Sequence, residues 1–207
     1  MSFVPDLNGI FAINECFNDD SRQNFMDLIT SKDLVNEVIK TRKYESAAGP
    51  DGIDYSVFKL IPNEASDFVI CLMKACLHSG RVPHNWKKSV MRLIYKKNDP
   101  MDPGNWRPIS ISNSLYRIIS CTWAKAINVI NTNISIFSPN QRGFIAGVNG
   151  CADNSSIVTE LFYDASRHNK SLVVTALDFR NAFGSVPHGM IDHTLRAKGF
   201  PLEIKTL

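Results

Sequence analysis

The stretch SLVVTALDFRNAF, residues 171–183, carries the strongest strand pattern in the chain, and its apolar run ends in a carboxylate, Asp178. Aliphatic and β-branched residues make both faces apolar, which is typical of a strand at the centre of a covered sheet. An acid at the carboxyl end of a buried strand lies where open α/β sheets hold ligands and catalytic groups. Asp178 is therefore a candidate ligand for a divalent cation, or else a cap for the turn that follows.

The segments on either side of this stretch indicate a chain that mixes helices with antiparallel strands. Helical spacing of apolar residues is found in four segments: 30–43, 63–79, 113–132 and 153–169. Residues 89–97 and 107–112 are rich in strand formers, and the turn residues between them predict a hairpin. This order of elements predicts an α+β fold.

The composition is that of a globular protein with no export or membrane signal. The chain has 207 residues, and no stretch approaches the ~20 apolar residues of a membrane span. The N-terminus lacks the basic flank and apolar core of a signal peptide. Five cysteines form no C-x-x-C pair, so we expect reduced thiols in an intracellular protein.

The net charge of +3 hides a strong asymmetry along the chain. Residues 1–80 contain 7 Lys and Arg against 12 Asp and Glu, a net −5. Residues 81–117 contain 8 against 2, a net +6, and residues 118–207 contain 8 against 6, a net +2. The middle block is therefore the expected surface for a polyanion, although a solvated basic face has the same composition.

The predicted hairpin, IYKKNDPMDPGNWRPIS at residues 94–110, carries most of the candidate binding residues. Lys96, Lys97 and Arg107 lie on its two arms and can converge on one anion, with Arg as a bidentate donor and Lys as a point charge. The alternative is an ordinary charged hairpin. Trp106 is predicted to pack the hairpin base rather than to stack on a nucleobase.

Two glycine-containing loops have weaker patterns. SAAGPDGI, residues 46–53, lacks the G-x-x-x-x-G-K-[ST] pattern of a phosphate-binding loop, so a structural turn is the better interpretation. In NQRGF, residues 140–144, the Gln and Arg before the glycine can touch a nucleic-acid backbone or simply close a loop. No His or Cys cluster has zinc-site spacing.

Taken in order, four stretches resemble the reverse transcriptases of non-LTR (LINE-type) retrotransposons. They are SAAGPDGI, VPHNWKKSVMRLIYKKNDPMDPGNWRPISISNSLYRIIS, SPNQRGFIAGVNGCADN and ALDFRNAFGSVPHGMIDHTLRAKGFP. The resemblance implies an N-terminal fragment of a right-hand polymerase: a helical extension (1–45), fingers (46–170) and the start of the palm (171–207). This palm portion would hold the first catalytic strand and the following helix, and would stop before the family's Tyr-x-Asp-Asp motif.

The resemblance also implies roles for residues around the first palm strand. Asp178 would be the first catalytic carboxylate and would bind both Mg²⁺ ions of a two-metal site. Phe183 would lie under the incoming sugar and exclude a 2′-hydroxyl, while Phe179 and Arg180 would offer backbone amides to the triphosphate. Many relatives have Asp where this chain has Gly184.

Other roles implied by the resemblance fall in the fingers. The positions that grip the triphosphate match Lys96 or Lys97 and Arg107. The motif whose loop lies along the template matches Gln141, Arg142 and Gly143. The partners would be an RNA template, a DNA primer and deoxynucleoside triphosphates, with no membrane. We expect such a protein in a cytoplasmic ribonucleoprotein and, in a eukaryote, the nucleus.

The implied activity is RNA-directed DNA polymerisation, but we expect none from these 207 residues alone, because one carboxylate cannot assemble a two-metal site. One alternative is a catalytically dead relic that binds nucleic acid through its basic block. Another is a fragment of a group II intron-type maturase. A third is an unrelated α+β domain in which Asp178 is only a cap.

Overall fold

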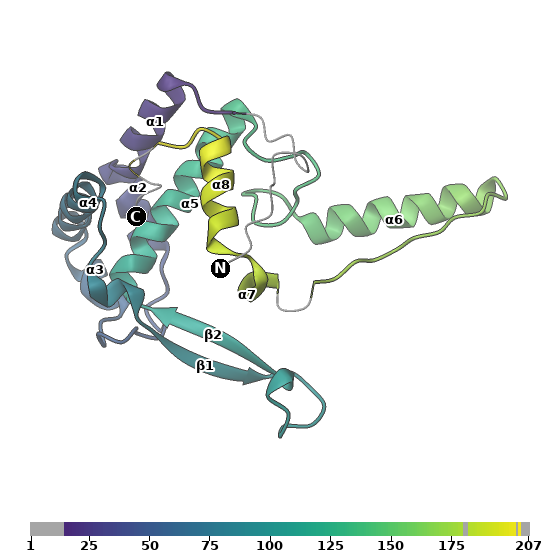
Figure 1. The fold of residues 1–207 in the computed structure, drawn as a ribbon, viewed down its shortest axis with the longest axis horizontal. Helices are drawn as coiled ribbons and strands as arrows, with labels where there is room; N and C mark the ends of the chain where they lie inside the picture. The colour runs from purple at the N-terminus through teal and green to yellow at the C-terminus, as the bar shows by residue number, and fades with distance from the viewer. Residues whose placement is uncertain (1–14, 180–181, 202, 204–207) are drawn as a thin grey trace.

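The computed structural model describes residues 15–179, 182–201 and 203, and most of these residues lie in helices (Figure 1). The elements follow in the order α1 (Asp19–Ile29), α2 (Lys32–Thr41), α3 (Tyr55–Leu60), α4 (Pro62–Ser79), β1 (Ser89–Tyr95), β2 (Trp106–Ser112), α5 (Ser114–Ile134), α6 (Gly150–Arg167), α7 (Ala182–Ser185) and α8 (His188–Ala197). Short 3₁₀ turns precede each strand, at His84–Lys87 and Pro103–Asn105. The coarse prediction of a mixed α and β chain is confirmed.

Helix boundaries follow from capping residues in the sequence. Asn18 caps α1 in a capping box with Ser21, each side chain accepting a hydrogen bond from the other residue's backbone N–H. Ser31 caps α2 by accepting from the backbone of Leu34. At the other end of α4, Gly80 stops the helix with a φ of 62°, a left-handed conformation that glycine adopts without strain.

The core is formed by α1, α2, α4 and α5. The side of α5 that faces the core is made by Ile118, Ile119, Thr122, Ala126 and Ile130, all buried, as their helical spacing predicts. The buried residues contributed by α1, α2 and α4 include Phe25, Ile29, Val35, Val38, Ile39, Val69 and Met73. The helices before residue 45 therefore share one core with α4 and α5, and a boundary after residue 45 stays a prediction.

The hairpin predicted from residues 89–112 is confirmed. Strands β1 and β2 pair antiparallel, with Ser89 opposite Ser112 and Tyr95 opposite Trp106. The pair projects from the start of α5 (Figure 1). It is the one sheet among the residues that the structure describes.

The strand predicted at residues 171–178 is not formed, and this prediction was wrong. Residues 170–179 run extended from the far end of α6 back toward α7 without strand pairing (Figure 1). Their side chains are mostly exposed, Val173 and Leu177 strongly so. A β-branched run favours extended backbone, but a strand also needs a neighbouring strand for its hydrogen bonds, and the described residues place none beside this segment.

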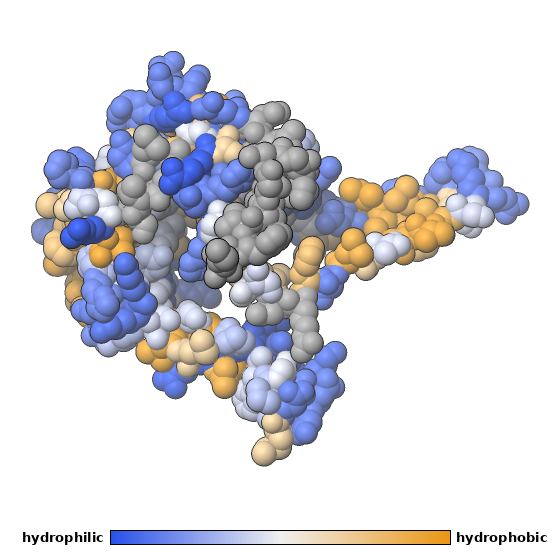
Figure 2. All heavy atoms as spheres, in the orientation of Figure 1, coloured by the Kyte–Doolittle hydropathy of each residue, from blue (hydrophilic) through white to orange (hydrophobic). Residues whose placement is uncertain are grey.

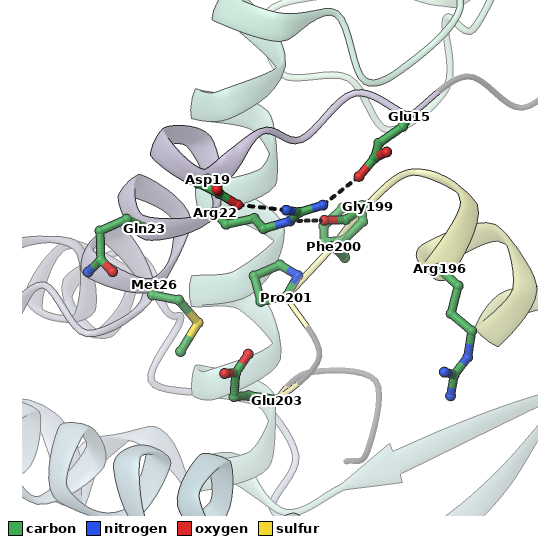
Figure 3. A pocket seen from close by; sticks show the side chains of 10 residues that line it. All are labelled: Glu15, Asp19, Arg22, Gln23, Met26, Arg196, Gly199, Phe200, Pro201 and Glu203. Atoms are coloured by element: carbon green, nitrogen blue, oxygen red, sulfur yellow. Dashed lines mark hydrogen bonds and ion pairs between the residues drawn. The ribbon is translucent and has the colours of Figure 1, made fainter.

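The segment after α8 is bound to α1, although about 180 residues of sequence separate them. The Arg22 side chain donates through Nε to the carbonyl of Gly199 at 2.8 Å and forms ion pairs with Glu15 and Asp19 (Figure 3). Beside it, the Phe200 ring packs against those of Phe17 and Phe25, with centroids 4.5 and 5.8 Å away. None of the described helices is long and apolar enough to cross a membrane.

Candidate functional site

Three cationic side chains lie on one face of the β1–β2 hairpin. Arg107 pairs directly with Ile94, and Arg92 pairs with Ile109. Residues two apart on a strand and residues directly opposite across a ladder share a face, so Arg92 and Arg107 lie on the same side. Lys96 extends the ladder, since its backbone N–H donates to Asn105 at 2.9 Å, and so joins them. We call Arg92, Lys96 and Arg107 the cation face.

The opposite face of the hairpin carries no charged side chain and is mostly apolar. It presents Met91, Leu93 and Tyr95 from β1 and Trp106 and Pro108 from β2. The Tyr95 and Trp106 rings lie 5.3 Å apart, and the Trp106 indole donates to the carbonyl of Pro100 at 2.8 Å. Trp106 therefore packs on the hairpin, as predicted, but at its loop end rather than at its base, and this packing helps to hold the cation face in register.

The cation face has no counter-charge in the described part of the chain. All three side chains are exposed, and no ion pair to a described carboxylate involves them. Diagonal neighbours across a ladder are separated by roughly 7–8 Å, a spacing at which several cations can contact one polyphosphate. Lys97 lies in the loop beyond β1, where strand alternation no longer sets its direction.

Asp178, the predicted catalytic carboxylate, lies in the extended segment before α7. Its side chain is exposed, and no ion pair or hydrogen bond to another described residue is found for it. The exposed carboxylate is thus accessible to a cation that prefers oxygen ligands.

The described residues do not by themselves assemble a two-metal site. They contain no group of three His, Cys, Asp or Glu side chains close enough to hold a metal ion. Mg²⁺ usually binds through one or two carboxylates together with substrate phosphates and water. Asp178 fits the role of one such ligand, whereas a pair of bridged ions requires further carboxylates.

The predicted template loop is held by its own side chains. The Gln141 amide donates to the carbonyl of Gly143 at 2.8 Å, and Arg142 pairs with Asp153 on α6 at 3.2 Å. A side chain at Gly150 would lie 2.7 Å from Arg142 Cβ, so the glycine permits this close approach. Arg142 therefore anchors the loop to α6, which leaves Gln141 and the backbone as its exposed contacts.

Phe183, which is predicted to lie under the incoming sugar, packs beside the predicted template loop (residues 141–143). Phe183 on α7 lies edge-on to Phe144, which follows Gly143, with ring centroids 6.3 Å apart. Both rings are largely exposed, Phe183 by 86%. Phe179 is also exposed, while Arg180 lies outside the described residues. The residue predicted to contact the sugar and the loop predicted to contact the template are thus neighbours.

The structure adds Arg92, which the sequence interpretation did not single out. The signal was present, because Arg92, Ile94 and Lys96 are alternate residues of the predicted strand 89–97, and the two cations therefore fall on one face. By contrast, a cavity of about 510 Å³ between α1 and the segment after α8 contains none of the predicted site residues (Figure 3).

Apolar side chains cover much of the arm formed by α6 and the extended segment that follows it. Figure 2 shows this arm as the largest hydrophobic region in the view. The exposed apolar residues on α6 are Ile157, Leu161, Phe162 and Tyr163. The arm links the template loop at one end to Asp178 at the other.

A family model described as "Reverse transcriptase (RNA-dependent DNA polymerase)" matches residues 94–206. The matched range contains Lys96, Arg107, the template loop, Asp178 and Phe183. It begins within β1, so Arg92 and the helices before it lie outside the match.

Similar curated proteins come from retrotransposons. The chain is 32% identical over 183 residues, 88% of its length, to the "Retrovirus-related Pol polyprotein from type-2 retrotransposable element R2DM" of Drosophila melanogaster. It is 30% identical over 175 residues to the "Retrovirus-related Pol polyprotein from type-1 retrotransposable element R2" of Nasonia vitripennis, covering 84% of this chain. A "Probable RNA-directed DNA polymerase from transposon X-element" of Drosophila melanogaster is 29% identical over 157 residues, 74% of this chain. The chain spans 16–17% of the length of these relatives.

Proposed function

The chain belongs to the reverse transcriptase family, and we propose that it forms the nucleotide-binding part of an RNA-directed DNA polymerase of a non-LTR retrotransposon. The reaction joins a deoxynucleotide to the 3′ end of a primer and releases pyrophosphate. The substrates are a deoxynucleoside triphosphate, a DNA primer and an RNA template. The observation that carries this proposal is the cation face, which lies within and beside the matched range without a counter-charge among the described residues.

The cation face suits a triphosphate because of its geometry. Arg107 offers a planar fork that donates two parallel hydrogen bonds to one phosphate group. Arg92 on β1 and Lys96 just beyond its end lie diagonal to Arg107 and neutralise the neighbouring phosphates. As the bond to the leaving pyrophosphate breaks, negative charge grows on these oxygens, and fixed cations stabilise that charge more than the ground state.

Asp178 and Phe183 support the proposal from the other end of the chain. Reverse transcriptases generally use divalent metal ions, and bound Mg²⁺ would supply Lewis-acid activation of the reacting phosphate. Asp178 would hold the metal through its exposed carboxylate, together with further carboxylates, since the described residues bring no group of three such ligands together. Phe183 would contact the sugar, and its ring would exclude a 2′-hydroxyl by volume.

The test is calorimetric titration of the 207-residue chain with dGTP, comparing Arg107→Gln with the unaltered chain. Charge-assisted hydrogen bonds contribute about 1.5–3 kcal/mol each, so we expect binding at least about tenfold weaker. Arg81→Gln is the matched control, because Arg81 is an exposed arginine of the same basic block outside the hairpin.

Deoxyguanosine without phosphates should bind both variants alike. If Arg81→Gln weakens dGTP binding as much as Arg107→Gln, general surface charge explains the effect and the proposed site is wrong. If Arg107→Gln lowers RNA binding but leaves dGTP binding unchanged, the chain is better explained as an RNA-binding relic.

A further inference from the structure

A second basic site lies apart from the cation face, in a cavity of about 580 Å³ between the end of α2, α3 and α5. Residues from three distant parts of the sequence line it: Thr41, Arg42, Lys43, Ser46, Tyr55, Ser112, Tyr116, Arg117, Ser120 and Cys121. The three cations among them face no lining carboxylate, while six lining residues carry hydroxyls. This composition is that of an anion site, since nearly every polar group can donate a hydrogen bond.

The two arginines of the cavity are held in place but are not neutralised. Arg117 donates through Nη2 to the carbonyl of Ala47 at 2.7 Å and to the Ser114 hydroxyl at 3.0 Å. Arg42 donates through Nη1 to the Cys121 sulfur at 3.3 Å. All of these acceptors are neutral, and no ion pair to a described carboxylate involves either arginine.

One donor on each arginine has no acceptor within the described protein. The Nε atoms of Arg42 and Arg117 are both buried and make no hydrogen bond. A buried donor without a partner typically costs about 1–3 kcal/mol, and more when the group is charged. Two guanidinium groups that converge on one cavity also repel each other. A bound oxyanion would relieve this repulsion.

Tyr55 lies against the two arginines. The Arg117 guanidinium lies over its ring, 4.8 Å from the centroid. Burial raises the pKa of the Tyr55 phenol, and the charges of Arg117 and Arg42 act in the opposite direction. Tyr55 is therefore a neutral hydroxyl at physiological pH and can donate to an anion.

The size and lining of the cavity favour a nucleotide unit over a lone phosphate. Pockets of about 300–1,000 Å³ typically hold molecules with tens of atoms. Tyr116 offers an aromatic ring at the wall, and rings beside cations are typical of surfaces that bind single-stranded nucleic acid. Ser112 lines the cavity and is the last residue of β2. The cavity therefore adjoins the base of the hairpin that carries the cation face.

We propose that this cavity binds a backbone phosphate of single-stranded RNA through Arg42, Lys43 and Arg117. The inference rests on the proposed function for the choice of RNA, but the site is separate from the cation face. It makes the start of α5 and the end of α2 parts of one RNA-binding surface. Arg117 contributes from the basic block, whereas Arg42 and Lys43 come from the acidic N-terminal third of the chain.

The test measures binding of a fluorescent 12-nucleotide oligouridylate by anisotropy over a range of KCl concentrations. We expect the double variant Arg42→Gln/Lys43→Gln to bind about tenfold more weakly than the unaltered chain. The slope of log affinity against log salt should fall by about 0.7 for each phosphate that the variant no longer neutralises. Lys40→Gln/Lys74→Gln is the matched control, because it removes two exposed helical lysines outside the cavity.

Equal weakening in both double variants would overturn the proposal, because it would show that only general charge matters. A second arm adds inorganic pyrophosphate and follows thermal unfolding. If pyrophosphate protects the unaltered chain but not the cavity variant, while RNA binding is the same in both, the occupant is a small phosphate and the RNA assignment is wrong.

Titration with dGTP separates this proposal from the proposed function. The cavity variant should bind dGTP like the unaltered chain, while Arg107→Gln should not. If the double variant fails to fold by circular dichroism, Lys43→Gln alone provides the test, because Lys43 is exposed and its truncation leaves the core intact. The single variant should show about half of the change in salt slope, and an unchanged slope would count against the site.

Discussion

Gly49 shows how one residue joins a sequence motif to the core. It opens the turn that Pro50 and Asp51 continue, with the Gly52 N–H donating to its carbonyl at 3.0 Å. A Cβ at Gly49 would lie 2.7 Å from the backbone nitrogen and Cα of Asn113, at the start of α5. The motif is therefore a structural turn, as predicted, and its glycine is required because the turn packs directly on the backbone before α5.

Gly49→Ala should destabilise the fold by about 1–3 kcal/mol, because backbone atoms of Asn113 would have to move. Gly189→Ala is the control, since a Cβ at Gly189 in α8 meets nothing within 4 Å. We expect that substitution to be neutral or stabilising by up to about 1 kcal/mol. Urea unfolding of the two variants measures the difference, and similar midpoints would show that the close approach at Gly49 does not matter.

At the scale of elements, the hairpin is held by its own contacts rather than by the core. Its strands are mostly exposed on both faces, and an isolated two-stranded pair is only marginally stable. The contact of Tyr95 with Trp106 and the indole hydrogen bond to Pro100 stabilise the loop end of the hairpin, which is the end farthest from α5. The cation face depends on this register, since a slip of one residue would move Arg107 to the opposite face.

Trp106→Ala should loosen the hairpin and leave the helices unchanged. Removing the ring pair and hydrogen bond should cost about 1–2 kcal/mol locally, so amide exchange in β1 and β2 should rise about tenfold. Exchange in α5 should stay the same. Met101→Ala, in the loop of the same hairpin, is the control because its side chain is exposed. Faster exchange throughout the molecule would mean that the hairpin is coupled to the core.

At the scale of the whole molecule, the segment after α8 completes the core around α1. Phe200 is only 5% exposed and packs with Phe17 and Phe25. The backbone N–H groups of Cys16 and Phe17 both donate to the carbonyl of Lys198, at 3.1 and 3.2 Å. The arm of α6 and the extended segment therefore belongs to a chain that leaves the core after α5 and returns to it at Phe200 (Figure 1).

Phe200→Ala should destabilise the entire fold by about 3 kcal/mol, because it leaves a cavity beside the rings of Phe17 and Phe25. Phe179→Ala should change stability by less than about 0.5 kcal/mol, because that ring is 80% exposed. Chemical denaturation followed by circular dichroism compares the two. Equal effects would mean that the contact between the segment after α8 and α1 does not support the core.

The site residues were predicted unevenly, and the reason is the kind of contact involved. Strand alternation and turn chemistry are local, so the hairpin with Lys96 and Arg107 followed from the sequence. The cavity around Arg42 and Arg117 did not, because its residues come from segments as far apart in sequence as α2 and α5. The contact between Phe144 and Phe183 likewise could not be predicted from the spacing of residues along the sequence.

The sequence by itself determined helices α2, α4, α5 and α6, the hairpin and the family resemblance, because each depends on short-range spacing and residue type. Only the tertiary structure decided that the segment at residues 171–178 is extended and unpaired rather than a central strand, because a strand forms only where a neighbour meets its hydrogen bonds. Tertiary packing also decided that Phe200 joins α1 and that two arginines share one cavity, because only the folded chain brings residues so distant in sequence into contact.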